Sequence, residues 1–452
     1  MAIKQNKKKV CLISLGCPKN LVDSEVMLGA LNKNEYEITC SEIEADIIII
    51  NTCCFIEDAK VESINAILKA TQLSEGSEKK ILIVAGCLAE RYNNEIIKEI
   101  PEVDGVVGTG YCEKISEVID MAYEDKKPVL FGNFDYCNYN GVNRIVSTPK
   151  GYAYLKIAEG CDNHCTYCVI PFLKGCLRSR RLEDILCEAE HLVQCGAKEI
   201  IIVAQDTTAY GKDIYNGKKL ALLLQELEKI DRLKWIRILY CYPDEIDDEL
   251  LEEIARNPKV CKYFDIPVQH ISDKILKKMG RRGSGNDIES LIEKIRNRIP
   301  EAVIRTSIMV GFPGEEDYDF SLLTSFIKKT GFDNLGVFIY SEEEGTPAAN
   351  FKNNATKKIK KERYKKIMLM QKEIAEAKSK TRINKTYEVL IEGTTGNGKH
   401  YYGRSYAEAP DIDGIIYFNS DNPLKVGNFV NVKIIKSHEY DLIGVVENES
   451  AK

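Results

Sequence analysis

The sequence lacks long hydrophobic runs. Its longest aliphatic runs, such as Ile81 to Ala85, are far shorter than the ~20 residues that a membrane-spanning helix needs. The basic stretch Met1 to Val10 is not followed by an apolar region and a small-residue cleavage site, so no secretory signal is predicted. We therefore expect a cytoplasmic protein with no membrane partner.

The sequence also has few histidines and no surplus of positive charge. Five histidines leave little room for His-rich zinc sites, and 63 basic against 69 acidic residues give a net charge of −6. Because a protein that binds mainly to phosphates leans basic, bulk nucleic-acid binding is disfavoured. The 452 residues are 44% hydrophobic and 29% charged, which excludes a disordered chain and suggests about three domains.

What the sequence does contain is 16 cysteines. Disulfides are rare in a reducing compartment, so these cysteines are expected to be either ligands or ordinary reduced thiols. Their positions in the predicted domains select the ligand candidates.

Residues 1–140 are predicted to form an open parallel α/β sheet. Uninterrupted aliphatic runs, typical of strands covered on both faces, alternate with amphipathic stretches at about 35 residues per unit. The expected strands are Lys9 to Leu15, Ala45 to Ile50 and Lys80 to Ala85, and the expected helices are Ser24 to Asn32 and Asp58 to Leu73.

Residues 147–353 contain six strand-like runs separated by helical patterns. Six units are too few for an eight-unit barrel but suit a partial (βα)6 barrel of the TIM type, whose chemistry lies at the carboxyl ends of the strands. The expected strands are Tyr152 to Ile157, Glu199 to Val203, Trp235 to Tyr240, Tyr263 to Val268, Val303 to Met309 and Asn334 to Tyr340. The expected helices include Leu182 to Cys195, Lys219 to Ile230, Asp244 to Arg256 and Asp287 to Arg298.

The last part of the chain contains a basic segment and then a run of short strands. Residues 357–382 carry eleven basic and three acidic residues, and we interpret them as a linker helix with solvated lysines rather than a ribosomal-RNA contact. Residues 383–449 have short strands joined by glycine turns, which predicts a small antiparallel β-barrel. Its expected strands are Tyr387 to Glu392, His400 to Arg404, Gly414 to Phe418 and Phe429 to Ser437.

Three cysteines follow the first predicted barrel strand: Cys161, Cys165 and Cys168. Thiolates select zinc, copper(I) or an iron–sulfur cluster. Structural zinc takes four ligands, yet no second CxxC pair is present, and His164 as a fourth ligand would stand between two of the cysteines. A thioredoxin-like motif would not include Cys161. Three ligands suit a four-iron cluster with one iron left open, so we favour a cluster over zinc.

The pattern CxxxCxxC, with Tyr167 before its last cysteine and a βα barrel around it, resembles the radical S-adenosylmethionine superfamily. The resemblance implies that Cys161, Cys165 and Cys168 are catalytic: their cluster binds S-adenosylmethionine and cleaves it to a 5′-deoxyadenosyl radical. Polar residues at strand ends and a glycine-rich turn are then the expected cofactor lining. They are Tyr167, Gln205, Asp206, Gln269, His270, Arg305, Ser307, Gly311, Pro313, Gly314 and Glu315.

A second set of cysteines follows the strands of the first domain: Cys17, Cys53 and Cys87. The carboxyl ends of parallel strands meet at one edge of a sheet, so these three thiolates are expected to bind a second cluster. The alternative is that they are ordinary buried cysteines, as we expect for Cys11, Cys40 and Cys112. Cys54 stands beside Cys53, and the sequence leaves open which of the two is the ligand.

Two three-cysteine sets followed by a small β-barrel resemble the methylthiotransferases along nearly the whole chain, with the last barrel similar to a TRAM domain. The resemblance implies two 4Fe-4S clusters and two molecules of S-adenosylmethionine per turnover, one as methyl donor and one as radical source. It also implies an electron donor such as flavodoxin or ferredoxin, and a sulfur source. Cys54 stands where the family usually has a small residue.

Two branches of that family compete. The segments Ser14 to Glu25 and Gly403 to Gly414 resemble the branch that modifies the β-carbon of an aspartate in the twelfth protein of the small ribosomal subunit, rather than the transfer-RNA adenosine branch. The last domain, with seven basic and ten acidic residues from Ile383 onward, suits a basic protein and repels phosphate. The expected docking residues are Arg404, Glu408, Asp411 and Asp413.

Two alternatives are weighed against this interpretation. The Asp-Gly pair in the docking segment also suits a plain exposed turn. The second alternative belongs to another functional class. It is a non-catalytic iron–sulfur redox sensor or adaptor, which would not release 5′-deoxyadenosine.

Overall fold

The computed structural model describes residues 7–33, 36–74, 80–132, 134, 144–352, 355–396 and 398–447. It divides into two compact units. Unit 1 contains residues up to 147 with the segments 159–162 and 168–178, and unit 2 contains 148–158, 163–167 and 179 onward. The expected domain limits at residues 140, 353 and 449 lie outside the described residues. Among the helices described, none is long and apolar enough to cross a membrane.

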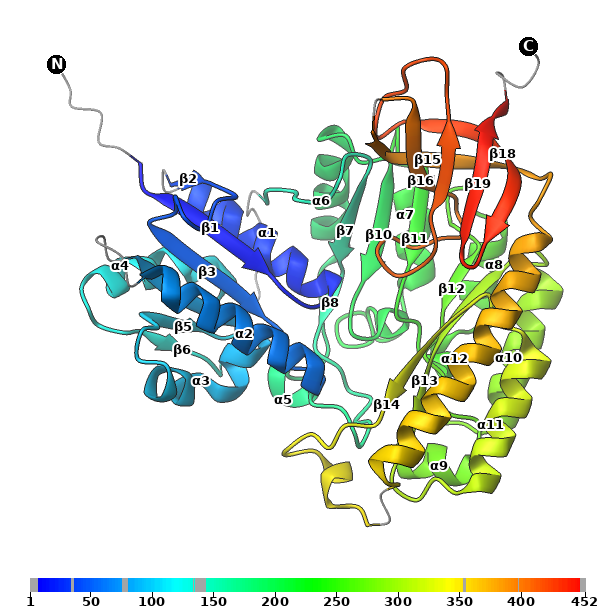
Figure 1. The fold of residues 1–452 in the computed structure, drawn as a ribbon, viewed down its shortest axis with the longest axis horizontal. Coiled ribbons are helices and arrows are strands. Elements are labelled where there is room, and N and C mark those ends of the chain that lie inside the picture. The colour runs from blue at the N-terminus through cyan, green and yellow to red at the C-terminus, as the bar shows by residue number, and fades with distance from the viewer. Residues whose placement is uncertain are drawn as a thin grey trace. The chain divides into compact units, whose positions relative to one another are not determined.

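Unit 1 is built on a six-stranded parallel sheet in the order β2-β1-β3-β4-β5-β6 (Figure 1). The three predicted strands are present, and β2, β5 and β6 were not predicted because they are only two or three residues long. The strands are β1 (Lys9–Ser14), β2 (Glu37–Ile38), β3 (Ile47–Thr52), β4 (Ile81–Gly86), β5 (Gly105–Val107) and β6 (Val129–Leu130). The helices are α1 (Pro18–Lys33), α2 (Glu57–Ser74), α3 (Cys87–Glu99), η1 (Cys112–Lys114), α4 (Ile115–Tyr123) and α5 (Ile170–Lys174).

The sheet of unit 1 is covered on both faces. Every residue of β3 is buried, and its side chains alternate between two hydrophobic cores: Ile48 and Ile50 belong to one, Ile47 and Ile49 to the other. A strand that packs on both faces needs apolar residues at every position, which is why β3 reads as an uninterrupted aliphatic run.

Unit 2 begins with the partial barrel that the sequence predicts. Two three-stranded parallel sheets, β7-β10-β11 and β12-β13-β14, are joined by a parallel bridge between Ile236 and Val260. β11 ends two residues before the expected Tyr240, whose φ of 63° takes the backbone out of the extended region. The strands are β7 (Tyr152–Lys156), β10 (Glu199–Val203), β11 (Trp235–Ile238), β12 (Tyr263–Asp265), β13 (Val303–Val310) and β14 (Asn334–Ile339).

The barrel helices begin where polar side chains cap them. α8 starts at Asp248, later than expected, because the Asp247 carboxylate accepts the Leu250 N–H at 3.0 Å and residues Pro243–Glu245 form a separate 3₁₀ turn. The helices are α6 (Leu182–Gln194), α7 (Leu220–Glu228), α8 (Asp248–Arg256), α9 (Asp273–Lys278), α10 (Gly285–Arg298) and α11 (Asp317–Thr330), with 3₁₀ turns η3 (Thr207–Ala209), η4 (Pro243–Glu245) and η5 (Pro347–Asn350).

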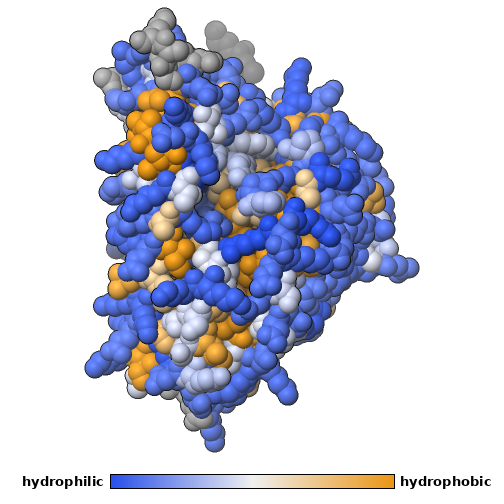
Figure 2. Space-filling model, turned by 90° about the vertical axis from the view of Figure 1, so that its right-hand side faces the viewer, coloured by the Kyte–Doolittle hydropathy of each residue, from blue (hydrophilic) through white to orange (hydrophobic). Residues whose placement is uncertain are grey.

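The basic segment forms one long helix, α12 (Lys357–Lys380), that runs along the barrel (Figure 1). Its buried residues recur every four positions and face the barrel, where the Gln371 amide donates to the Phe332 carbonyl oxygen at 3.1 Å. Figure 2 views the side that is on the right in Figure 1 and shows mainly hydrophilic side chains there. The helix is therefore laid on the barrel, as the sequence predicts.

The chain ends in a closed five-stranded barrel in the order β15-β16-β17-β19-β18. Strand directions cannot alternate all the way round a ring of five, so one pair is parallel, and this pair is β17 with β19. The expected antiparallel barrel is thus correct for every other pair, and β19 was not predicted. The strands are β15 (Thr386–Thr395), β16 (His400–Arg404), β17 (Ile416–Asn419), β18 (Phe429–His438) and β19 (Asp441–Val446).

Within unit 2 the closed barrel lies at the amino ends of the partial-barrel strands (Figure 1). The ring of Trp235, the first residue of β11, packs edge-on against Phe429 with ring centres 4.6 Å apart. The carboxyl ends of the same strands, where the chemistry of βα barrels lies, face the other way.

Candidate cluster and cofactor sites

Cys17, Cys53 and Cys87 come together at the carboxyl edge of the unit 1 sheet. Cys53 and Cys87 directly follow β3 and β4, Cys17 lies three residues beyond β1, and these three strands are neighbours. The sheet changes its direction of growth between β1 and β3, and such a switch point opens a crevice at the carboxyl ends. Burial raises the pKa of the Cys87 thiol well above its ordinary value, and the nearby Cys54, Cys53 and Cys17 raise it further.

Two glycines with left-handed backbone allow these loops to approach one another. A Cβ on Gly16, whose φ is +90°, would lie 2.7 Å from the Cβ and 3.0 Å from the Sγ of Cys53. A Cβ on Gly86, also at φ +90°, would lie 2.2 Å from the Asn51 side-chain oxygen. Only glycine fits at both positions, so these two glycines allow the three strand ends to pack closely together.

Two buried asparagines tie the strand ends together. The Asn20 amide donates to the carbonyl oxygens of Leu15 at 3.0 Å and Thr52 at 2.8 Å, and the Asn51 amide donates to the Asn20 carbonyl oxygen at 2.8 Å. The Cys87 Sγ lies 3.8 Å from the Asn20 side-chain oxygen. Sequence reasoning missed both asparagines, although each lies within three residues of a predicted ligand.

The two adjacent cysteines differ in their surroundings. Cys54 is fully buried in the hydrophobic core on one face of the sheet, a core that also contains Cys87. Cys53 lies against Gly16 at the carboxyl edge, and burial raises the pKa of its thiol.

A buried cation lies near these thiols. The Lys174 ammonium is 3.1 Å from the Asp23 carboxylate and 3.6 Å from that of Glu159, all with side chains about 3% exposed. Burial lowers the pKa of Lys174, but the two carboxylates more than offset this, and the ammonium in turn lowers the pKa of Cys87. Three soft sulfur donors at one sheet edge fit a thiolate-bound cluster, whereas Lys174 is already neutralised by its two carboxylate partners.

The loop that carries Cys161, Cys165 and Cys168 is divided between the units: Cys161 and Cys168 belong to unit 1 and Cys165 to unit 2. In unit 1 the Cys161 N–H donates to the Gly175 carbonyl oxygen at 3.1 Å. Among the described residues, no three His, Cys, Asp or Glu side chains are placed to bind one metal ion. A four-iron cluster does not need such a group, because its cysteines bind separate iron atoms.

In unit 2 the middle of this loop is anchored to the segment after α9. The Thr166 N–H donates to the Met279 carbonyl oxygen at 2.9 Å, and the Ala348 N–H donates to the Thr166 carbonyl oxygen at 2.9 Å. Gly280 has φ +69°, and a Cβ there would lie 3.2 Å from the His164 carbonyl oxygen. The backbone around Cys165 is therefore held against the barrel.

The predicted cofactor residue Asp206 contacts the same loop. Its carboxylate accepts from the Asn163 amide at 2.6 Å and from the Thr208 hydroxyl at 2.5 Å, and burial raises its pKa. Arg282 donates to the Asn163 side-chain oxygen at 2.8 Å. No pattern in the sequence pairs these residues, since only folding brings β10, the cysteine loop and the end of α9 together. Gln205, next to Asp206, is half-buried at the same strand end.

The predicted glycine-rich turn packs on the cysteine loop. Tyr167 meets Phe312 edge-on with ring centres 6.3 Å apart. The Glu315 carboxylate accepts the N–H groups of Gly311 and Phe312 and pairs with Arg363 at 3.1 Å. This fully buried carboxylate is therefore committed to closing the turn, in which Pro313 and Gly314 are also buried.

Gln269, His270 and Ser307 lie on neighbouring segments. The Gln269 N–H donates to the Ser307 carbonyl oxygen at 2.8 Å, and its φ of +68° is rare for a residue with a side chain. Its buried Oε1 has no hydrogen-bond donor among the described residues, so it fits an amino or hydroxyl group of a cofactor. His270 is fully buried, accepts the Ser272 N–H at 3.0 Å, and burial lowers its pKa to about 4, which keeps the imidazole neutral.

Arg305 was expected to line the cofactor site, but its side chain is already engaged in ion pairs. Its guanidinium donates to the Asp265 carboxylate at 2.7 Å and lies 3.8 Å from that of Asp413 in the closed barrel. The side chain is thus engaged in an ion-pair network that faces the closed barrel.

Three of the four expected docking side chains are buried rather than exposed. Arg404 is 1% exposed and pairs with Glu199 at 2.8 Å; Glu408 accepts the Ser405 hydroxyl at 2.6 Å and also pairs with Arg382. The Asp413 carboxylate accepts from the Tyr263 hydroxyl at 2.6 Å. The sequence does not show the burial of Arg404 and Asp413, because their partners Glu199 and Tyr263 lie 205 and 150 residues away in the chain. Of the four, only Asp411 is exposed.

Glu199 is the centre of this buried network, which leads to the first prediction. Its two carboxylate oxygens accept from Arg237 at 2.7 Å and Arg404 at 2.8 Å, and all three side chains are at most 1% exposed. Glu199→Gln removes the carboxylate partner of the buried Arg237 and leaves Arg404 with Glu392 at 2.6 Å. We expect the free energy of unfolding to fall by about 3–5 kcal/mol. The single tryptophan, Trp235, at the junction reports the transition in urea.

The control for this prediction is Glu388→Gln, which removes the more exposed pair with Lys234 at the same junction. Exposed pairs contribute little, so we expect a change below about 1 kcal/mol. Equal losses from both variants would contradict a structural role of the buried network.

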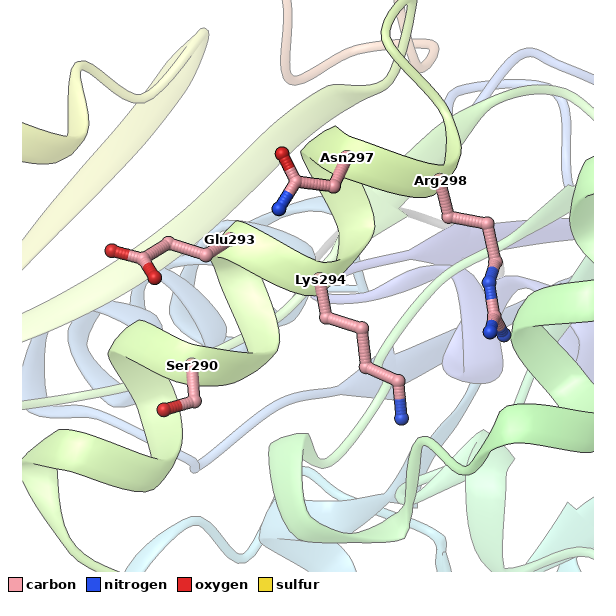
Figure 3. A pocket seen from close by; sticks show the side chains of 5 residues that line it. All are labelled: Ser290, Glu293, Lys294, Asn297 and Arg298. Carbon is pink, nitrogen blue, oxygen red and sulfur yellow. The ribbon is translucent and has the colours of Figure 1, made fainter.

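A surface cleft on α10 is a poor candidate for the active site. It is lined by Ser290, Glu293, Lys294, Asn297 and Arg298, which all belong to this one helix (Figure 3). Lys294 and Arg298 are already paired with Asp248 at 2.8 and 2.9 Å. The cleft contains none of the residues that the sequence singles out.

Three family models match the chain. They are the uncharacterized protein family UPF0004 over residues 9–108, the radical SAM superfamily over residues 155–327 and the TRAM domain over residues 383–446. A solved radical S-adenosylmethionine methyltransferase, TsrM from Kitasatospora setae, has a TM-score of 0.57 at 16% identity and covers 76% of this chain and 74% of its own. This likeness shows the fold. Fold and sequence motifs together define a protein of the radical SAM superfamily, as predicted.

Curated relatives define the family more closely. One from Acetivibrio thermocellus is 54% identical over 99% of this chain and 100% of its own length, and one from Clostridium tetani is 49% identical over 99% and 100%. Both are named ribosomal protein uS12 methylthiotransferase RimO. The chain belongs to this family of uS12 methylthiotransferases, which confirms the branch chosen from its sequence.

Proposed function

We propose that the protein adds a methylthio group to the β-carbon of an aspartate of ribosomal protein uS12. The observation that carries this proposal is the 54% identity to a protein of that name over 99% of the chain. The grouping of Cys17, Cys53 and Cys87 at one sheet edge supports it, because sulfur insertion needs a sulfur-handling site apart from the radical site.

The radical SAM family implies a 4Fe-4S cluster and S-adenosylmethionine. We propose that Cys161, Cys165 and Cys168 hold this cluster, which supplies, when bound, the electron that cleaves S-adenosylmethionine. Asn163 and Thr166 hold the loop in place through Asp206 and Met279. We further propose that Cys17, Cys53 and Cys87 hold a second 4Fe-4S cluster, and that two molecules of S-adenosylmethionine are used per turnover.

The remaining site residues take different roles in this proposal. The backbone of the buried turn at residues 311–315 supports the cofactor, because the Glu315 carboxylate is already used within the turn. Gln269 offers its buried Oε1 as an acceptor. The lining is completed by Gln205, Asp206 and Ser307. His270 and Arg305 do not contact the cofactor but hold neighbouring segments in place through their own hydrogen bonds.

Several partners follow from this activity. We propose an electron donor such as flavodoxin or ferredoxin, a separate sulfur source, and a cytoplasmic location where ribosomal proteins assemble. Asp411 is the exposed acidic side chain of the expected docking segment, whereas α12 keeps its interpretation as a linker helix with solvated lysines, and a ribosomal-RNA contact is the alternative. We also propose the domain limits 1–140, 147–353, 357–382 and 383–449.

The test incubates the reconstituted protein with S-adenosylmethionine, dithionite and sulfide, separately with uS12 and with transfer RNA. We expect a methylthio mass gain on uS12 at an aspartate, and 5′-deoxyadenosine as co-product. A mass gain on the transfer RNA alone would assign the adenosine activity instead. No release of 5′-deoxyadenosine in either mixture would indicate a non-catalytic sensor.

A further inference from the structure

Arg281 is a buried arginine beside the cysteine loop, and its surroundings are unusual. Its guanidinium donates to the Pro267 carbonyl oxygen at 2.7 Å and to the Tyr167 hydroxyl at 3.4 Å, and it stacks 4.2 Å above the centre of the Tyr242 ring. The residue is 7% exposed. None of these partners carries a full negative charge.

Other buried arginines of the described chain are paired with carboxylates. The ion-paired arginines with buried guanidinium groups include Arg144 with Glu25, Arg237 and Arg404 with Glu199, and Arg363 with Glu315. The neighbouring Arg282, whose side chain is half exposed, still pairs with Asp244 at 2.8 Å and Glu245 at 2.7 Å. In contrast, the interactions that the structure gives Arg281 include no carboxylate.

A buried cation without a counter-charge is costly, so such an arrangement is expected where a negative group is to be bound. Cys165 is a candidate, because its Sγ lies 3.9 Å from the hydroxyl of the same Tyr242 on which Arg281 stacks. Burial lowers the pKa of Arg281, but Tyr167, Tyr242 and Cys165 more than offset this, so the guanidinium stays charged. Its charge is therefore fixed one aromatic ring away from a proposed cluster ligand.

We propose that Arg281 is a positioning residue that supplies the counter-charge for the iron–sulfur cluster bound through Cys165. The inference rests on the proposed function, because it requires a cluster at Cys161, Cys165 and Cys168. Three thiolates give such a cluster a net negative charge, and one-electron reduction adds another. A fixed cation stabilises the reduced form more than the oxidised form, so it raises the reduction potential and makes reduction of the cluster by the electron donor more favourable.

The experiment measures bound iron and the cluster's midpoint potential, by redox titration followed with electron paramagnetic resonance. It uses the full chain with Cys17, Cys53 and Cys87 replaced by alanine, so that one proposed cluster contributes to the signal. In this background we expect Arg281→Gln to shift the potential to more negative values. Arg281→Lys, which keeps the charge, is expected to stay close to the background value.

Arg256→Gln is the matched control, because it removes one positive charge from an exposed arginine that pairs with Glu253 at the end of α8. We expect no shift from it. An unchanged potential in Arg281→Gln with full iron content, or an equal shift in Arg281→Lys, would overturn the inference. So would a higher KM for S-adenosylmethionine at unchanged potential, since Arg281 would then bind the cofactor itself.

A variant that loses its cluster also tests the role of Arg281. If Arg281→Gln binds no iron, rescue of both iron and potential by Arg281→Lys supports the charge role, and failure of that rescue contradicts it. A background protein that binds no iron at all would contradict the proposed function rather than the role of Arg281. The two failures are therefore distinguishable.

Discussion

Replacing Cys161, Cys165 and Cys168 together by alanine is expected to abolish release of 5′-deoxyadenosine from S-adenosylmethionine, a loss of more than ~10³-fold. Bound iron should fall from about eight to about four atoms per chain, because the second set of cysteines is untouched. The physical reason is that no other residue of the loop offers a soft thiolate at this spacing. Anaerobic iron and sulfide assays and chromatography of the nucleoside products measure both effects.

The control is Cys176→Ala, an exposed cysteine eight residues beyond Cys168. It should keep both the iron content and the nucleoside release, since no proposed role falls on it. Nucleoside release that persists in the triple variant would show that the radical chemistry does not depend on this loop.

The second large effect distinguishes two adjacent cysteines. Cys53→Ala is expected to lose the second cluster and to reduce methylthio product by more than ~10³-fold, while release of 5′-deoxyadenosine under dithionite continues. Cys54→Ala should keep both clusters and the activity. Cys53 lies against Gly16 at the carboxyl edge, whereas Cys54 is fully buried in the core beside Ile48, so its loss costs only packing, about 1–2 kcal/mol of stability.

We test this prediction by measuring iron content, product mass and urea unfolding for the two variants. The reverse pattern, with iron lost from Cys54→Ala and retained in Cys53→Ala, would move the ligand assignment to Cys54. Retention of all iron in both variants would contradict a cluster at this edge.

The architecture could be predicted largely from the sequence, because it depends on local patterns. Aliphatic runs such as Ile47 to Ile50 identify buried parallel strands, and the strand–helix rhythm identifies βα units. What was missed is short or non-local: two- and three-residue strands have too little pattern, and β19 is a strand because it closes the barrel between β17 and β18.

The candidate sites show the same difference between local patterns, which a sequence reveals, and distant contacts, which it does not. The cysteines of the loop, and those that follow β1, β3 and β4, could be selected because strand direction alone puts such residues at one edge. The docking segment was misread because the partners of Arg404, such as Glu199, are about two hundred residues away. Charge is visible in a sequence, but whether it is compensated by a buried partner is not.

The sequence by itself determined the kind of chemistry: 16 cysteines, two sets of three after predicted strands, and few histidines indicate clusters rather than zinc. The tertiary structure decided which side chains surround them. It placed Asn20 and Asn51 between the strand ends, Cys54 in the core, and Arg281 on the ring of Tyr242, whose hydroxyl lies near Cys165. The reason is physical: ligand type follows from side-chain chemistry, whereas burial and charge compensation depend on contacts between residues far apart in the chain.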